Sequence, residues 1–139
     1  MNREIDDIAK ANMVDAQKNT EEQLDYYQAM VKFFENDRSD TLMKLRSFAL
    51  YSPRQVLSDF LVKYELFKLI LDMPGSVLEF GVFNGQGLFS FAQCSAILEP
   101  NNLNRKIFGF DTFEGFQGIS EQDARGSSPF LEEGGFSGA

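Results

Sequence analysis

The sequence predicts an α/β fold in which a parallel strand–helix–strand unit follows a helical N-terminal region. An apolar run at 77–80 ends in a glycine-rich turn, and a mostly apolar helix is predicted over 86–98. A second short apolar run follows at 107–110, after a polar loop. A helix-containing connection of this length joins parallel strands, so we expect the two strands to be neighbours in one sheet.

Residues 1–72 are predicted to be helical. Sparse apolar positions at 3–18 indicate a short amphipathic helix. Thr20 and Gln23 form a capping-box pattern that opens the next helix, and its apolar positions recur at helical spacing up to Phe34. These signals predict a helical N-terminal region ahead of the α/β unit.

The helix nearest the first strand has the clearest start signal of the chain. Ser52 is a good N-cap and Pro53 suits the first helical position. The helix should end near Asp72, and a further short helix is expected at 42–49. We therefore divide the chain into a helical region, 1–72, and an α/β region, 73–139. Because the apolar helix faces exceed what two strands can cover, we expect a homo-oligomer formed through the N-terminal helices.

Composition excludes several classes of protein. The 139 residues have a net charge of −8, and 73–139 contains only three basic residues against eight acidic ones. Nucleic-acid binding needs a basic surface, so we do not expect it. The chain has no His, a single Cys, no signal-peptide pattern and no apolar run that could span a membrane. We therefore expect a cytoplasmic protein without an internal disulfide.

The turn after the first strand has an unusual glycine spacing. Glu79 is followed by Gly81, Gly85 and Gly87, which does not fit the Gly-x-Gly-x-x-Gly pattern of dinucleotide sites. A carboxylate here would repel a pyrophosphate and suit a ligand with an amino group and a sulfonium charge. The spacing resembles motif I of class I S-adenosylmethionine-dependent methyltransferases. The alternative is a tight strand–helix turn that binds no ligand.

A second acidic residue, Asp111, ends the second predicted strand. An acidic side chain at this place can accept hydrogen bonds from the two ribose hydroxyls of a nucleoside. Dinucleotide sites and S-adenosylmethionine sites share this role, so Asp111 alone does not distinguish them. The alternative is an Asp that caps the following turn.

Three sequence runs give a more specific resemblance. The runs are 64–67, 77–85 and 109–116, the last reading Gly-Phe-Asp-Thr-Phe-Glu-Gly-Phe. Together they resemble the macrocin O-methyltransferase-like family, over roughly 52–139. This resemblance implies a Rossmann-like class I methyltransferase core, S-adenosylmethionine as cofactor, and a hydroxyl of a sugar or another small molecule as methyl acceptor.

The resemblance also implies the residues of the cofactor site. It places Asp111 on the ribose and Thr112 or Phe113 beside the adenine, and Arg54 could reach the cofactor carboxylate. The loop after the first strand would hold the methionine part of the cofactor. That loop consists of Glu79, Phe80, Gly81, Val82, Phe83, Asn84 and Gly85.

Methyltransferases of this family have a larger sheet than the two strands predicted here, so the core is expected to be incomplete. The catalytic base and the ligands of any divalent metal would come from later strands, beyond Ala139. We therefore expect the N-terminal part of a longer enzyme or a truncated product, with weak cofactor binding or none by itself. Two alternatives remain open: a non-catalytic assembly module and, disfavoured by the glycine spacing, an NAD(P)-linked oxidoreductase.

Other conspicuous residues favour structural roles. Cys94 is expected to be a buried small hydrophobic residue. Acidic residues at 121, 123, 132 and 133 are expected to be solvated loop charges rather than metal ligands. The phenylalanines at 108, 110, 113 and 116 are expected to serve mostly as core and lid.

Overall fold

The computed structural model describes residues 20–123, 131 and 133–135, and the chain forms two compact units, Met1–Arg54 and Gln55–Ala139. The division falls earlier than the boundary at Asp72 that the sequence predicted. The reason is that helix α5 contributes to the interior of the second unit, where its Phe67 is fully buried.

The first unit contains three described helices: α2 (Glu21–Asn36), α3 (Thr41–Arg46) and α4 (Phe48–Tyr51). The predicted capping box is confirmed, because the Gln23 amide donates to the Thr20 hydroxyl and the Thr20 amide donates to the Gln23 side chain, at 3.3 and 3.0 Å. The single short helix predicted at 42–49 is instead two helices that meet at Ser47. The predicted helix at 3–18 lies outside the described residues.

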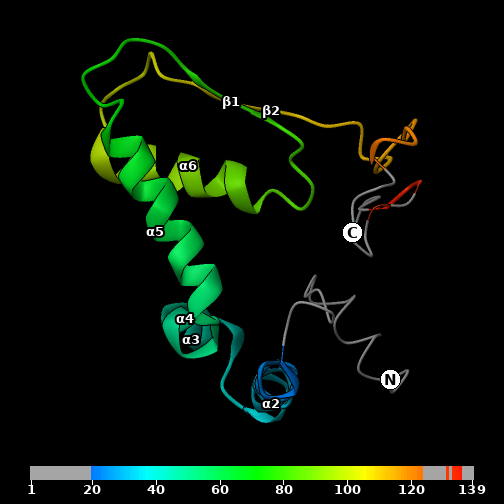
Figure 1. Cartoon of the computed structure of the whole chain (residues 1–139). Helices are drawn as coiled ribbons and strands as arrows, with labels where there is room; N and C mark the ends of the chain where they lie inside the picture. Colours follow the sequence, from blue (N-terminus) through cyan, green and yellow to red (C-terminus); the bar gives the residue numbers. More distant parts are fainter. Residues whose placement is uncertain (1–19, 124–130, 132, 136–139) are drawn as a thin grey trace. The chain divides into compact units, whose positions relative to one another are not determined.

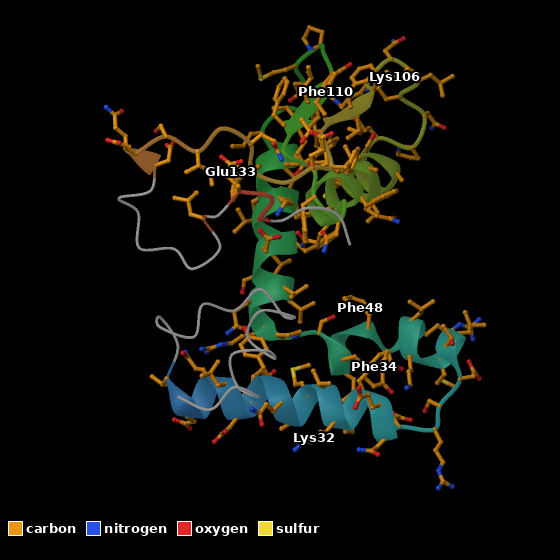
Figure 2. All side chains as sticks on the ribbon, turned by 90° about the vertical axis from the view of Figure 1, so that its right-hand side faces the viewer. Lys32, Phe34, Phe48, Lys106, Phe110 and Glu133 are labelled. Atoms are coloured by element: carbon orange, nitrogen blue, oxygen red, sulfur yellow. The ribbon has the colours of Figure 1, made fainter. Side chains whose placement is uncertain are left out.

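Tyr51 organises the first unit. Its ring lies 5.7 Å from the ring of Phe33 and 5.3 Å from that of Phe34, and its hydroxyl donates to Asp37 at 2.5 Å. Phe34 and Phe48 line one pocket together with Tyr51, and both are labelled in Figure 2. Several apolar side chains of α3 and α4 remain more than half exposed: Leu42, Met43, Leu45, Phe48 and Leu50.

The second unit contains the predicted strand–helix–strand arrangement. Helix α5 (Arg54–Lys68) is followed by β1 (Val77–Phe80), α6 (Gln86–Leu98) and β2 (Ile107–Phe110). β1 and β2 are adjacent and parallel, with Glu79 opposite Gly109. Figure 1 shows the two strands side by side. The predicted strands and connecting helix are thus confirmed. The helix before β1 starts one residue later than Pro53 and ends at Lys68 rather than near Asp72, in turns that continue to Met73.

Helix α6 packs closely on one face of the sheet. A Cβ atom at Gly109 would lie 2.7 Å from the Val82 side chain and 2.9 Å from that of Leu88, so a larger residue here would force these side chains to shift. Cys94 is fully buried, as predicted, and burial raises the pKa of its thiol. No helix in the described part of the chain is long and apolar enough to cross a membrane.

The opposite face of the sheet is exposed and aromatic. Leu78 and Phe80 alternate with Glu79 and therefore point away from α6, and Phe80 stacks on Phe110 with ring centroids 5.1 Å apart. Phe108, Phe110, Phe113 and Phe116 were expected to serve mostly as core and lid, and the core part of that expectation is wrong because they are 42 to 60% exposed. Phe80, on the same face of the sheet as Phe110, is 75% exposed.

A buried arginine fastens the amino end of the sheet. Arg105, which is 8% exposed, donates to Glu99 at 2.6 Å and to the carbonyl oxygens of Ile70, Met73 and Gly75. Burial opposes the charge of Glu99, but its hydrogen bonds prevail and hold its pKa below the usual value. Arg105 thus joins the turn after α5 to the start of β2 through hydrogen bonds to the carbonyls of that turn.

Candidate functional site

The chain turns sharply between β1 and α6. Gly81 and Gly85 both have φ of 85°, in the left-handed region that favours glycine, and the Gly85 amide donates to the Val82 carbonyl at 2.8 Å. Gly85 is also the N-cap residue of α6. The predicted glycine turn between strand and helix is therefore present, at the carboxyl end of β1.

Asp111 joins this turn to the loop after β2. Its two carboxylate oxygens accept the backbone amides of Phe83 and Phe113, at 2.7 and 2.8 Å. Both phenylalanines have positive φ, 48° and 57°, which is rare for a bulky residue and is tolerated where surrounding contacts enforce it. The hydrogen bonds from Phe113 and then Phe83 hold the pKa of Asp111 below its usual value.

A pocket of about 480 Å³ opens beside Asp111, at the carboxyl ends of the two strands. Ligands bind at this edge in open α/β sheets. Backbone, aromatic and polar groups line it together: Gly81, Phe83, Phe110, Asp111, Thr112, Gly115, Phe116 and Gly135. A Cβ atom built on Gly81 meets nothing within 4 Å, so the pocket has open space directly against that backbone.

Four of the predicted cofactor residues meet in this pocket: Gly81, Phe83, Asp111 and Thr112. The other predicted residues do not line it. Val82 is buried, Asn84 accepts the Gln86 amide at 3.3 Å, and Phe113 is 60% exposed. Arg54 is the first residue of α5 and closes the first unit, so its predicted contact with the cofactor stays a prediction.

Glu79 points to the α6 side of the sheet. Its carboxylate occupies the place where a Cβ atom of Gly87 would lie, and one of its oxygens, Oε2, is buried without a hydrogen-bond partner. Burial raises the pKa of Glu79, although the nearby Lys63 works in the opposite direction. The structure therefore places Glu79 beneath the start of α6, and it does not line the pocket.

Four pocket residues were not predicted as ligand contacts, and the reasons differ. Phe110, Gly115 and Phe116 belong to the distinctive run at 109–116, but the two phenylalanines were assigned to core and lid and Gly115 was given no role. Gly135 had no sequence signal, because it lies far from Asp111 along the chain. It reaches the pocket because the Phe116 amide donates to the Gly135 carbonyl and the Gly134 amide donates to the Phe116 carbonyl, both at 2.9 Å.

The described part of the chain contains no group of three or more acidic or Cys side chains placed to hold a metal ion. A divalent metal bound by residues outside this chain, as the resemblance implied, stays a prediction. The described residues offer hydrogen-bond acceptors, aromatic surface and close backbone approach, which are the features of a site for an organic ligand.

Comparison with known proteins gives a consistent answer. No family model matches the sequence, and no curated protein matches it. The crystal structure of CalS11, a calicheamicin methyltransferase, is similar to this chain with a TM-score of 0.79 and 31% identity, over 87% of this chain and 46% of CalS11. The apo structure of CalS11, described as a TDP-rhamnose 3'-O-methyltransferase, gives a TM-score of 0.66 and 32% identity, over 73% of this chain and 44% of CalS11.

The chain thus spans less than half the length of the solved structures that it matches. The finer resemblance to macrocin O-methyltransferases stays a prediction. At this identity the likeness reaches beyond a shared arrangement of helices and strands. We conclude that the chain has an O-methyltransferase-like fold, and that the two parallel strands joined through α6 in its second unit are consistent with an incomplete Rossmann-like core.

Proposed function

We propose that this chain is the cofactor-binding part of an S-adenosylmethionine-dependent O-methyltransferase that acts on a hydroxyl of a sugar or another small molecule. The observation that carries the proposal is the pocket beside Asp111, at the carboxyl ends of two parallel strands in a methyltransferase-like fold. A sugar hydroxyl as acceptor is supported by the likeness to CalS11, a TDP-rhamnose 3'-O-methyltransferase.

The residues of the pocket fit a nucleoside with an amino-acid tail. Each carboxylate oxygen of Asp111 already accepts one backbone amide and has a further lone pair, so the pair can still receive two ribose hydroxyls. Phe110 and Phe116 supply aromatic surface for a base, and the open space at Gly81 admits a ligand against the backbone. S-adenosylmethionine supplies an activated methyl group when bound.

The chain's own contribution to the reaction is to bind and orient. Methyl transfer to oxygen needs the acceptor hydroxyl held in line with the reactive carbon, and a base that takes the hydroxyl proton. The loops around Asp111 would fix the cofactor side of this geometry. The base and the acceptor-binding groups are expected from residues outside this chain.

A second candidate function is a non-catalytic assembly module. The exposed apolar surface of α3 and α4 favours self-association, which this function requires. The apolar side chains of α3 and α4, among them Leu45 and Phe48, are 51 to 66% exposed. We propose that these helices contribute to a homo-oligomer, in which such surface would be covered. This interface is compatible with cofactor binding in the second unit.

Titration of the ¹⁵N-labelled chain with S-adenosylmethionine tests the proposal, because amide shifts detect binding that is weak. We expect saturable shifts at the amides of Gly81, Phe83, Thr112 and Gly115, and no comparable shifts with NAD. Shifts at these amides with NAD alone would favour the oxidoreductase. If neither ligand shifts these amides, in this chain or in any longer product of the same reading frame, the non-catalytic assembly module becomes the favoured function.

A further inference from the structure

Two short segments after β2 form one side of the pocket. We name Gly115–Ile119 the wall loop and Glu133–Gly135 the strap. Two backbone hydrogen bonds join them, from Phe116 to Gly135 and from Gly134 back to Phe116, both 2.9 Å. Each segment contributes to the pocket lining, the wall loop through Gly115 and Phe116 and the strap through Gly135.

The strap approaches the wall loop more closely than a side chain would allow. Gly115 has φ of 73°, and a Cβ atom there would lie 2.5 Å from the Gly135 carbonyl oxygen and 2.6 Å from that of Gly134. Both obstacles are backbone atoms, which cannot rotate away as a side chain would. The contact between the two segments therefore depends on a glycine at this position.

Glu133 completes the contact through its side chain. Its two carboxylate oxygens accept the consecutive amides of Gly118 and Ile119, at 3.2 and 2.8 Å. Gly118 has φ of 67°, and consecutive amides next to a residue in this conformation make a concave site for an anion. Glu133, labelled in Figure 2, is an exposed loop residue, as expected, and its carboxylate in addition binds this backbone site.

We propose that Glu133 is a positioning residue of the pocket. It does not line the pocket, but its carboxylate holds the strap on the wall loop, and this fixes the places of Phe116 and Gly135. The identity of the ligand rests on the function proposed above, whereas the role of Glu133 in fastening the two segments does not. Binding would thus be controlled from a residue that makes no contact with the ligand.

Amide hydrogen exchange without any ligand tests the fastening directly. Glu133→Gln removes the charge and leaves a single acceptor oxygen for two amides, so we expect exchange at Gly118 and Ile119 to accelerate about threefold to tenfold. The matched control is Glu121→Gln, which makes the same change in charge on an exposed residue. Equal exchange rates in wild type and Glu133→Gln would overturn the proposal, whether or not the chain binds S-adenosylmethionine.

Ligand affinity tests the positioning. We expect Glu133→Gln to weaken S-adenosylmethionine binding about threefold to tenfold, while the thermal midpoint stays within a degree or so of wild type because the site is exposed. If Glu133 acts by placing Phe116, the same substitution in a Phe116→Ala background should have little further effect. Additive losses in the double variant would overturn the positioning role. Failure of wild type to bind would count against the proposed function, and the exchange result would still decide the role of Glu133.

Discussion

The two ends of the β1–β2 sheet are built in opposite ways. At the amino end, Arg105 is 8% exposed, and its guanidinium reaches one carboxylate and three backbone carbonyls from the turn after α5. At the carboxyl end, Asp111 accepts amides from two loops whose phenylalanines have positive φ, beside an open pocket. A charged side chain bridges chain segments at both ends, and at the carboxyl end a pocket of about 480 Å³ lies beside it.

This difference separates stability from binding within one small unit. A buried cation with several hydrogen bonds has little conformational freedom, and its removal takes a hydrogen bond from several partners at once. At the carboxyl end, the Asp111 carboxylate holds two loops in uncommon backbone conformations, which cost stability. The same carboxylate keeps its remaining lone pairs for hydrogen bonds from a ligand. We therefore expect substitutions at the amino end to change the free energy of unfolding and those at the carboxyl end to change affinity.

The largest effect is expected at Arg105. Arg105→Ala would remove the ion-pair partner of the buried Glu99 and the side-chain hydrogen bonds to three carbonyls, which should lower the free energy of unfolding by about 3–5 kcal/mol. Arg105→Lys should recover only part of this loss, because an ammonium cannot reproduce the planar fork. Urea unfolding measures both, with Lys106→Ala as the exposed neighbouring control. A loss no larger than that of the control would contradict the role assigned to Arg105.

At the carboxyl end, Asp111→Ala should weaken S-adenosylmethionine binding about tenfold to a hundredfold, because ribose hydroxyls would lose a charged acceptor. Gly81→Val should do at least as much, since its side chain would fill the open space beside the pocket and its φ of 85° disfavours a β-branched residue. Titration calorimetry measures the affinity, and urea unfolding measures the stability. If both variants unfold instead of binding more weakly, the carboxyl end also determines stability, and the expected difference between the two ends of the sheet is wrong.

A smaller effect of opposite sign is expected at Glu79. Its raised pKa means that the folded chain keeps the proton more readily than the unfolded chain, so the ionised carboxylate costs stability at neutral pH and costs nothing well below its usual pKa of 4.5. Glu79→Gln should therefore stabilise the chain by about 1 kcal/mol near pH 7 and by less near pH 4.

The same variant sharpens the assignment of the pocket. Because Glu79 lies beside Gly87 and does not line the pocket, cofactor affinity should change little in Glu79→Gln. A large loss of affinity, with unchanged stability, would instead support the direct cofactor contact that the sequence predicted.

The smallest effect is expected in the first unit. The hydrogen bond from Tyr51, followed by those from Ser39, lowers the pKa of Asp37 from 3.8 to about 2. A lowered acid pKa stabilises the fold above pH 3.8, and this contribution is lost as the pH falls toward about 2. Tyr51→Phe keeps the ring and removes the hydroxyl, so its thermal midpoint should lie below wild type near pH 5 and converge with it near pH 2. A constant difference between the two thermal midpoints across this pH range would show that the ionisation of Asp37 does not cause the loss of stability.

Local signals in the sequence predicted much of this fold correctly. The capping box at Thr20, the glycine turn after β1 and the parallel pairing of the two strands all follow from short-range chemistry or from the length of one connection. The pairing of Asp111 with a pocket at the strand ends follows from the same topology, since parallel strands bring their carboxyl ends to one edge.

The direction of side chains and the contacts between distant segments could not be predicted from local signals in the sequence. Glu79 turned to the α6 side because a strand residue points to one of two faces, and only packing against Gly87 decides which. Arg105 had no signal in the sequence, because the carbonyls that it binds in the turn after α5 lie far from it along the chain. The sequence by itself determined the strand–helix–strand unit and the edge of the sheet where a ligand would bind. The tertiary structure alone decided which carboxylates belong to the pocket, because it set what each one contacts. Asp111 accepts the Phe83 amide and Glu133 accepts the Ile119 amide, whereas Glu79 packs against Gly87.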